Sequence, residues 1–217
     1  MNMIVEKFLI AGGNITALVY DCPLSDRVRT SKKLLKEVEQ VGFVSTNATL
    51  PNLTMMGGEL CINATLAFAA TLGKNERLST SGLKTPIPYA NKKGSTTIKI
   101  PFKFKKDKNI ILLDGIGFIL YDVQEKSGIT KSELSDLSDK YKLPAFGGII
   151  YNKNKITPYV YVSEVDSFVK ETACGSGSVV FSIYSGIQDV MQPTGKIISI
   201  HKKEGYFDIS AQVTRYE

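Results

Sequence analysis

Short runs of β-branched and aromatic residues alternate along this chain with turn-forming Gly, Asn, Asp and Pro residues. This pattern is typical of β-strands separated by tight turns. The runs recur from one end of the chain to the other and predict sheet in both halves. The expected strands are Lys7–Ile10, Thr16–Tyr20, Thr96–Phe104, Asn109–Leu113, Gly117–Asp122, Gly148–Tyr151, Tyr159–Val162, Lys196–His201 and Phe207–Val213.

Two polar, lysine-containing segments predict surface helices over Arg29–Val41 and Lys131–Lys142. In the second segment, Thr130 or the pair Lys131-Ser132 stands where a capping residue is expected, and acidic residues follow.

Two further segments, Cys61–Leu72 and Cys174–Asp189, consist mostly of small and apolar residues. Such segments are typical of helices that are packed on nearly every side. Each begins at a cysteine, and about half of the chain separates the two. This arrangement favours two similar halves, each with strands wrapped around one buried helix.

The composition, 43% hydrophobic and 22% charged over 217 residues, suffices for one large domain or two lobes with a proper core. No apolar run approaches the roughly 20 residues of a membrane helix. The N-terminal segment meets a glycine pair too early for a signal peptide. The sequence therefore predicts a cytoplasmic protein without a membrane partner.

The formal net charge of +6 raises the question of a nucleic-acid partner. However, the lysines are spread along the chain, and their densest cluster, Lys103–Lys108, is typical of a solvated sheet edge. No motif of a nucleic-acid-binding module accompanies the charge. We therefore expect a small-molecule partner and no nucleic acid.

The chain contains three cysteines, Cys22, Cys61 and Cys174, and a single histidine, His201. An odd number of cysteines without a signal peptide argues against a disulfide framework. No C-x-x-C pair is present, so a zinc site would lack ligands. We expect no metal, Cys22 in a turn, and His201 in a late strand or at its end.

A thiol at a helix N-terminus faces free backbone N–H groups, which favour the reactive thiolate and can hold a carboxylate. Two such helices facing each other would place a thiolate and a thiol on opposite sides of one α-carbon. This is sufficient for stereoinversion by proton removal on one face and delivery on the other, without pyridoxal or metal. Alternatively, both cysteines are small buried hydrophobic residues, and position alone does not decide between the two interpretations.

Three segments carry a resemblance to a known family. G-G-E-L-C-I-N-A (Gly57–Ala64) and E-T-A-C-G-S-G-S (Glu171–Ser178) resemble the two catalytic motifs of the diaminopimelate epimerase superfamily, roughly C-G-N-G-A and E-T-x-A-C-G-T-G. A-G-G-N-I-T-A-L-V-Y-D (Ala11–Asp21) is similar to the family's N-terminal G-x-G-N-D-F turn. Their order and spacing agree over most of the chain.

This resemblance implies an α/β fold of two pseudo-symmetric lobes, each a curled, barrel-like mixed sheet around a central helix. It implies that Cys61 and Cys174 are the catalytic bases of a cofactor-independent amino-acid racemase or epimerase. It also implies that the substrate contacts Asn14 and the backbone N–H groups of Ile62, Asn63, Gly175 and Ser176.

The expected lobes are residues 1–107, with the first catalytic cysteine, and 108–205, with the second. Residues 206–217 are expected to form a strand that returns to the first lobe, as in the family. The oligomeric state stays open, with a homodimer as one option.

Two acidic residues, Glu59 and Glu171, precede the cysteines closely. One hypothesis is that either or both bind the substrate ammonium or tune a thiol, which places Glu171, and less firmly Glu59, in the site. The alternative is that they are acids favoured by a helix terminus, and the sequence does not separate the two.

Several departures from the family pattern affect the substrate. Ile62 and Ala64 replace the two glycines around Asn63, while Gly115–Phe118 and Leu143–Phe146 stand where side-chain-binding residues are expected. These losses argue against diaminopimelate. The form of the first cysteine motif is more similar to the histidine racemases of staphylopine-type opine metallophore synthesis.

Three alternatives remain beside an amino-acid racemase of that kind. The first is diaminopimelate epimerase itself. The second is an isomerase of the phenazine-biosynthesis type, a subgroup that generally lacks the cysteine pair. The third is a protein of this fold that binds an amino acid without turning it over, for which two bases would be unnecessary.

Overall fold

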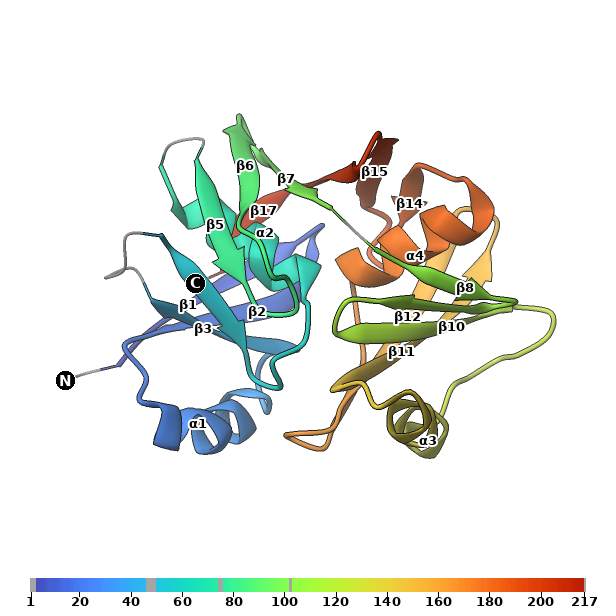
Figure 1. The fold of residues 1–217 in the computed structure, drawn as a ribbon, viewed down its shortest axis with the longest axis horizontal. Coiled ribbons are helices and arrows are strands. Elements are labelled where there is room, and N and C mark those ends of the chain that lie inside the picture. The colour runs from blue at the N-terminus through green and yellow to red at the C-terminus, as the bar shows by residue number, and fades with distance from the viewer. Residues whose placement is uncertain (1–2, 46–49, 74–75, 102, 217) are drawn as a thin grey trace.

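Two similar halves lie side by side in the computed structural model, which describes residues 3–45, 50–73, 76–101 and 103–216 (Figure 1). Each half has one helix at its centre and one on its outside. The central helices are α2 (Ile62–Thr71) and α4 (Gly175–Ser185), and the outer helices are α1 (Arg27–Leu34) and α3 (Lys131–Tyr141).

The strands of the first half form a continuous ribbon in which β1 pairs with β2, β2 with β3, and so on to β7. Only the β2–β3 and β4–β5 pairs are parallel. The strands are β1 (Ile4–Ile10), β2 (Gly13–Tyr20), β3 (Gln40–Ser45), β4 (Asn52–Met55), β5 (Arg77–Thr80), β6 (Ile87–Lys92) and β7 (Ser95–Ile100).

The second half forms the same kind of ribbon, from β9 through β10, β11, β12, β14 and β15 to β16. The short strands β8 and β13 pair with β9 and β12 respectively. The strands are β8 (Lys105–Asp107), β9 (Ile110–Leu113), β10 (Ile116–Asp122), β11 (Ala145–Asn152), β12 (Lys155–Val162), β13 (Ser167–Lys170), β14 (Asp189–Met191), β15 (Ile197–Lys203) and β16 (Tyr206–Ala211).

The two halves repeat one order of elements. An antiparallel hairpin leads into an outer helix, which crosses to a parallel strand, and an antiparallel neighbour then leads into the central helix. In the second half, β10, α3 and β11 take the places of β2, α1 and β3. This repeat confirms the predicted α/β fold of two pseudo-symmetric lobes around central helices.

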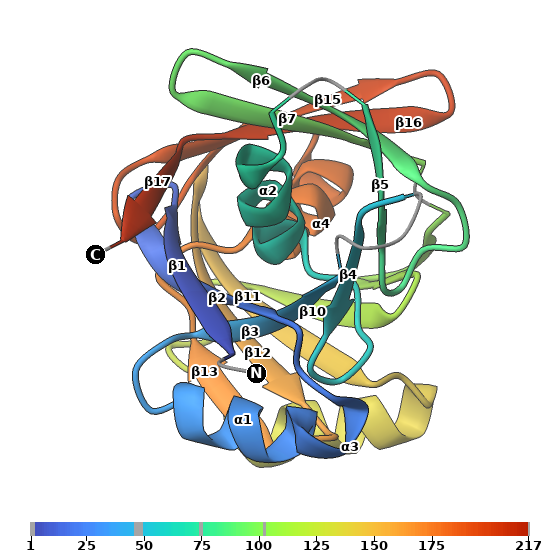
Figure 2. The same ribbon diagram turned by 90° about the vertical axis from the view of Figure 1, so that its left-hand side faces the viewer.

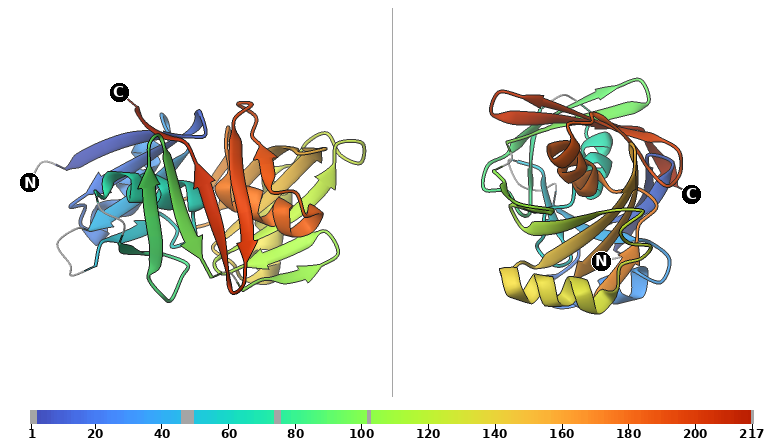
Figure 3. Two further views of the ribbon diagram at one scale, coloured as in Figure 1. Left: turned by 90° about the horizontal axis from the view of Figure 1, so that it is seen from above. Right: turned by 90° about the vertical axis from the view of Figure 1, so that its right-hand side faces the viewer.

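The halves are joined through the sheet as well as through the chain. β16 pairs antiparallel with β7, with Ile209 opposite Ile98, and β17 (Val213–Tyr216) pairs antiparallel with β1 (Figure 3). The last two strands therefore lie against the first half of the chain. The result is one large curled ribbon that holds both central helices.

The core lies between the central helices and the concave faces of the ribbon (Figure 2). In α2, every side chain from Ile62 to Ala69 is buried, and α4 is buried from Gly175 to Phe181. Burial on all sides explains why these helices are made of small and apolar residues. No helix in the part of the chain described by the structure is long and apolar enough to cross a membrane.

Some predicted elements differ from the structure, among them the strand expected over Phe207–Val213, which is divided at Gln212 between β16 and β17. The helix expected over Arg29–Val41 is wrong in its second part, because α1 ends at Leu34 and Gln40 begins strand β3. The helix from Cys174 ends at Ser185, where Gly186 takes a left-handed cap with φ of 80°, and Asp189 lies in a strand.

The strand expected over Thr96–Phe104 is also interrupted. It ends at Ile100, before Pro101, whose ring nitrogen cannot donate to a sheet, and Phe102 lies outside the described residues. Beyond it, β8 is fully exposed and pairs with β9 alone among the described strands, as expected of a solvated edge.

Two further singled-out residues, Cys22 and His201, lie outside the central helices. Cys22 lies in the loop between β2 and the 3-10 helix Leu24–Asp26, as expected of a turn residue. His201 lies in β15, exposed, with Nδ1 3.1 Å from Oε1 of Gln188.

Candidate active site

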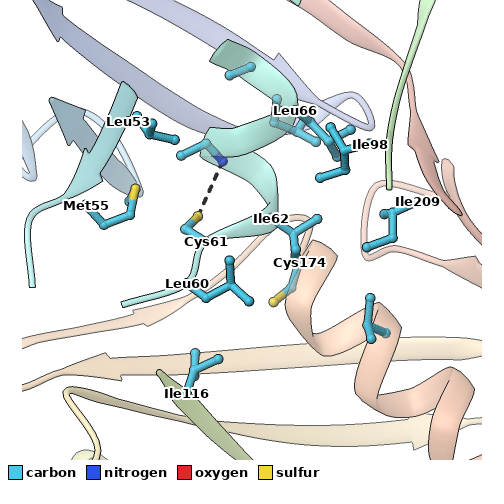
Figure 4. Close-up of a cluster of buried hydrophobic side chains, with 14 of the residues drawn as sticks. Leu53, Met55, Leu60, Cys61, Ile62, Leu66, Ile98, Ile116, Cys174 and Ile209 are labelled. Atoms are coloured by element: carbon cyan, nitrogen blue, oxygen red, sulfur yellow. Dashed lines mark hydrogen bonds between the residues drawn. The ribbon is translucent and has the colours of Figure 1, made fainter. Parts of the chain in front are cut away.

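Both central helices begin at a cysteine that serves as the N-cap residue. Cys61 and Cys174 have extended backbones, and each Sγ accepts a hydrogen bond from the backbone N–H three residues on, at 3.4 Å from Ala64 and 3.2 Å from Gly177. A cap of this kind normally uses a serine, threonine or aspartate oxygen. The two sulfurs thus take equivalent places at the facing starts of α2 and α4 (Figure 4).

The backbone of each cysteine is fixed in the same way by a hydroxyl in the first helical turn. Thr65 Oγ1 donates to the carbonyl of Cys61, and Ser178 Oγ donates to the carbonyl of Cys174, both at 2.6 Å. This repeated arrangement holds both cysteines in one orientation relative to their helices.

Each helix start also caps the other. Asn63 Oδ1 accepts from the N–H of Gly175 at 2.9 Å, and its Nδ2 donates to the carbonyl of Ala173 at 2.8 Å. In the opposite direction, Oγ of Ser176 lies 3.5 Å from the N–H of Ile62. The two helix starts are therefore tied together by their second residues.

The resemblance implies that four backbone N–H groups bind the substrate carboxylate, and these contacts already involve two of them. Those of Ile62 and Gly175 are already engaged with Ser176 and Asn63. The N–H group of Asn63 lies within reach of the Cys61 sulfur and lowers its pKa. The N–H group of Ser176 occupies the corresponding place at the start of α4, and the helix dipoles favour an anion at both starts.

Gly175 is required where the two helices meet. A Cβ atom at this position would lie 2.4 Å from Cγ2 of Ile62 and 3.0 Å from Oδ1 of Asn63. Ile62, which replaces a glycine of the family's first motif, thus packs directly against Gly175, a glycine that the second motif retains. Its bulk closes the contact between the helices and forms part of the wall beside the thiols.

A cavity between the halves contains both cysteines. Its titratable lining residues are the two thiols and the carboxyls of Glu39, Glu59 and Glu171; within the described chain no Lys, Arg or His lines it. No group of three or more His, Cys, Asp or Glu side chains among the described residues is arranged to hold a metal ion. The further lining residues are Gln40, Met56, Leu60, Ile62, Asn63, Ile116, Phe118, Val160, Val162, Ser167, Val169, Gly175 and Ser176.

The segment Gly115–Phe118 therefore does reach the site, but as an apolar wall. Ile116 and Phe118 line the cavity where the family resemblance led us to expect side-chain-binding residues. In contrast, no residue of Leu143–Phe146 is among the lining residues. These two segments thus offer the cavity no polar side chain for a distal amino-carboxylate.

Burial controls the acid–base state of the site. It raises the pKa of Glu171 to about 8 and that of Glu59 to about 7, although hydrogen bonds oppose the shift. Glu59 Oε2 accepts from the N–H of Gly57 at 2.9 Å, whereas Glu171 lies beside the thiol of Cys174. Both acids are thus poised to exchange protons near neutral pH.

The thiols themselves are protonated in this closed environment. Burial raises the pKa of Cys61 and of Cys174 well above 9.0, and the nearby Glu171 raises both further. The N–H groups of Ala64 and Gly177 lower the thiol pKa, as expected at a helix N-terminus, but burial outweighs them. A thiolate must therefore be generated in the site by transfer of its proton to a neighbouring group.

Gln40 is a site residue that the sequence did not reveal. Its Oε1 accepts a hydrogen bond from the thiol of Cys61 at 2.9 Å, and its Nε2 donates to Oε1 of Glu171. The predicted surface helix over Arg29–Val41 removed Gln40 from consideration, although a glutamine just before the apolar run Val41–Val44 was the available signal.

Asn14 is fully buried in β2 and is not among the residues that line the cavity. Its Nδ2 donates to Oε2 of Glu39 at 3.2 Å and to Oε1 of Glu171 at 3.3 Å, while its Oδ1 accepts from Thr16. With φ of 35°, it also occupies the left-handed region. In this structure Asn14 orients the acid that lies beside Cys174.

Replacement of Asn63 by alanine is expected to destabilise the protein by about 2 kcal/mol or more. The change leaves the N–H of Gly175 and the carbonyl of Ala173 buried without partners, and each such group costs about 1–3 kcal/mol. Denaturation by urea measures the loss. Asn109→Ala, which removes one partly buried bond to Leu120, is the control with a smaller expected effect, and an Asn63→Ala variant as stable as the parent would contradict the prediction.

Comparison with known proteins identifies the family of the chain. No protein-family model matches the chain. A histidine racemase from Fusobacterium nucleatum subsp. nucleatum is 30% identical over 207 residues, covering 79% of this chain and 77% of that protein. A histidine racemase from Staphylococcus aureus is 22% identical over 234 residues, covering 88% and 86%.

Solved structures share the fold. A predicted epimerase from Pseudomonas aeruginosa has a TM-score of 0.69 at 8% identity, covering 98% of this chain and 96% of that chain. A phenazine-biosynthesis PhzC/PhzF protein from Clostridium difficile has a TM-score of 0.64 at 13% identity, covering 100% and 98%.

The two-lobed fold, with a cysteine at the start of each central helix, defines an isomerase of the amino-acid racemase and epimerase class. More particularly, the chain belongs to the same family as the histidine racemases of Fusobacterium nucleatum and Staphylococcus aureus.

Proposed function

We propose that this protein interconverts the two enantiomers of histidine, with Cys61 and Cys174 as the two acid–base groups. The observation that carries the proposal is the pair of equivalent N-cap thiols at the facing helix starts, both lining one cavity. Histidine is favoured because the relatives that share most of the chain act on it by name.

The first step is the generation of a thiolate. Glu171 lies beside Cys174, and its raised pKa of about 8 makes its carboxylate a suitable acceptor for the thiol proton. Transfer of that proton gives a neutral carboxyl and a thiolate next to the α-carbon. Oε2 of Glu171 has no hydrogen-bond partner in the described chain and is therefore free to hold the proton.

Inversion then requires two proton transfers on opposite faces. The Cys174 thiolate removes the α-proton, and the negative charge moves onto the substrate carboxylate, where the N–H groups of Asn63 and Ser176 and the two helix dipoles stabilise it. Cys61 delivers its thiol proton to the other face and is left as a thiolate. The opposite enantiomer reacts in the reverse sense.

The acidic cavity also suits the substrate ammonium. Glu39, Glu59 and Glu171 surround the thiols, and among the described residues no cation lies opposite them in the cavity. A bound ammonium or imidazolium would lower the cost of ionising these carboxyls. We further propose that the protein works in the cytoplasm, where reducing conditions preserve free thiols such as its three cysteines.

The test is proton exchange in deuterium oxide under reducing conditions, without added cofactor. L-histidine and D-histidine are supplied separately, and chiral chromatography with mass spectrometry follows the product. We expect each enantiomer to yield the other with deuterium at the α-carbon. Exchange with another amino acid instead would change the substrate, and no exchange with any amino acid would favour a binding protein or another isomerase.

A further inference from the structure

The side chain of Gln40 connects the two catalytic halves. Gln40 begins strand β3, and its amide lies between the thiol of Cys61, 2.9 Å from Oε1, and the carboxyl of Glu171, which accepts from Nε2. Because Glu171 in turn lies beside Cys174, one amide separates the first thiol from the acid that serves the second.

This amide is asymmetric, since its oxygen only accepts and its nitrogen only donates hydrogen bonds. The observed orientation, with Oε1 beside Cys61 and Nε2 beside Glu171, suits a protonated Cys61 and an ionised Glu171. A half-turn of the amide would present N–H to a Cys61 thiolate and the oxygen to a protonated Glu171. Each orientation fits one combination of protonation states, and a mixed combination leaves a buried group without its partner.

The proposed reaction begins in one of these combinations and ends in the other, and the form with a Cys174 thiolate, in which Cys61 and Glu171 are both protonated, lies between them. In the active ionisation state, which becomes populated as the pH approaches the Glu171 pKa of about 8, Cys61 carries a proton, and Cys174 and Glu171 share one proton. After the α-proton has moved to Cys174 and the Cys61 proton has moved to the product, Cys61 is a thiolate, and Cys174 and Glu171 hold two protons. The total number of protons on the three groups is unchanged, and only their distribution differs.

We propose that Gln40 is a positioning residue that couples the two thiols, by turning its amide between an orientation that holds Cys61 as a thiol and one that holds it as a thiolate. The inference rests on the proposed two-thiol reaction. When the amide is turned, its nitrogen stabilises an ionised Cys61 and its oxygen accepts from a protonated Glu171. Cys61 and Glu171 therefore change their protonation states together.

The surroundings make this amide important. The Gln40 amide is hydrogen-bonded to the Cys61 thiol, and no Lys, Arg or His of the described chain lines the cavity to stabilise an ionised sulfur. Thr16 Oγ1 also lies 3.5 Å from Oε1 of Gln40. The titratable groups that face this network are Glu39, Glu59, Cys61, Glu171 and Cys174.

Two variants separate the functions of the amide. Gln40→Leu keeps the approximate shape but neither accepts nor donates, so kcat for histidine should fall about 10- to 100-fold while KM changes little. Gln40→Glu retains both functions only when its new carboxyl is protonated. Its activity should therefore survive at acidic pH and be lost as the pH rises, which shifts the kcat profile to lower pH.

The coupling is also measurable without substrate, by the ¹³Cβ resonances of labelled cysteine during a pH titration, with assignment from the single cysteine variants. In the parent protein, the Cys61 signal should respond when Glu171 titrates. In Gln40→Leu, this response should weaken and the Cys61 thiol should titrate at higher pH. Cys174, which contacts Glu171 directly, should keep its response and is the internal control.

An unchanged Cys61 titration and an unchanged kcat profile in Gln40→Leu would overturn the proposal. Loss of activity with an unchanged Cys61 titration would also overturn it, because Gln40 would then contact the substrate only. Absence of racemisation in the parent protein would refute the proposed function, whereas the titration would still test the coupling.

Discussion

Cys61→Ser and Cys174→Ser variants should each racemise histidine at least 100-fold more slowly than the parent protein. A positioned acid or base contributes about 10²- to 10⁴-fold to proton transfer, and a serine hydroxyl ionises too weakly to replace a thiol in either role. Serine is also a preferred N-cap residue, so α2 and α4 should keep their starts and the fold its stability. Initial rates from both enantiomers, with circular dichroism during thermal unfolding, measure the two effects.

The third cysteine provides the matched control. Cys22 is buried but lies outside the cavity, with its Sγ 3.8 Å from Oγ1 of Thr30 and 3.6 Å from the carbonyl of Pro23. Cys22→Ser should therefore racemise at the parent rate. A Cys61→Ser or Cys174→Ser variant with activity close to that of Cys22→Ser would contradict the two-base reaction.

The motifs at the two cysteines were predictable because they are local. A helix start needs only a capping atom and a few following residues. The apolar character of α2 and α4 predicts that both helices are buried. The repeat of a cysteine before a small, apolar segment in each half therefore predicted both central helices and, through them, the two-lobed fold.

Gln40 was not predictable in the same way. The residues from Arg29 to Glu39 are rich in lysine, leucine and glutamate, which are good helix formers, and the pattern extends past the true end of α1 at Leu34. Pairing with β2, which is distant in sequence, makes Gln40–Ser45 a buried strand instead. The same non-local pairing brings Gln40 to Glu171, so the error in secondary structure and the missed site residue have one cause.

The mutual capping of the two helix starts could not be predicted from the sequence either. Asn63 was expected to offer its backbone N–H to the substrate, but nothing local indicates that its side chain bonds to Ala173 and Gly175. Those contacts exist because the two halves pack with their helix starts in register. They depend on the tertiary arrangement and not on any spacing within one motif.

The stability of the protein should fall as the pH rises from about 5 to 8, and Glu171→Gln should remove much of this fall. Burial raises the pKa of Glu171 from 4.5 to about 8, so between these values the folded state holds a proton that the unfolded state releases. The contribution of Glu171 to the free energy of unfolding is therefore fully present below pH 4.5 and is lost as the pH rises to about 8. At about 1.4 kcal/mol per pKa unit, the loss is on the order of 5 kcal/mol.

Glutamine at position 171 keeps an oxygen that can accept from Gln40 and Asn14, but it does not ionise. Urea denaturation at a series of pH values should show the variant more stable than the parent at pH 8 and similar to it near pH 5. The pKa of Glu59 is raised less, to about 7, so the Glu171→Gln variant should still lose some stability as the pH rises. Adding Glu59→Gln should remove this remaining pH dependence. A variant with the parent's full pH dependence would mean that Glu171 is ionised at neutral pH.

This variant should gain stability where it loses function. Without a carboxylate beside it, the Cys174 thiol has no acceptor for its proton, so Glu171→Gln should be slow to racemise at the same pH at which it is more stable than the parent. Ionisation of a buried acid with an unpartnered oxygen costs free energy. The same cost gives the Glu171 carboxylate its affinity for the Cys174 proton, so a substitution that removes the cost also removes the proton acceptor. The instability at alkaline pH and the reactivity of Cys174 thus have the same physical origin in one buried carboxyl group.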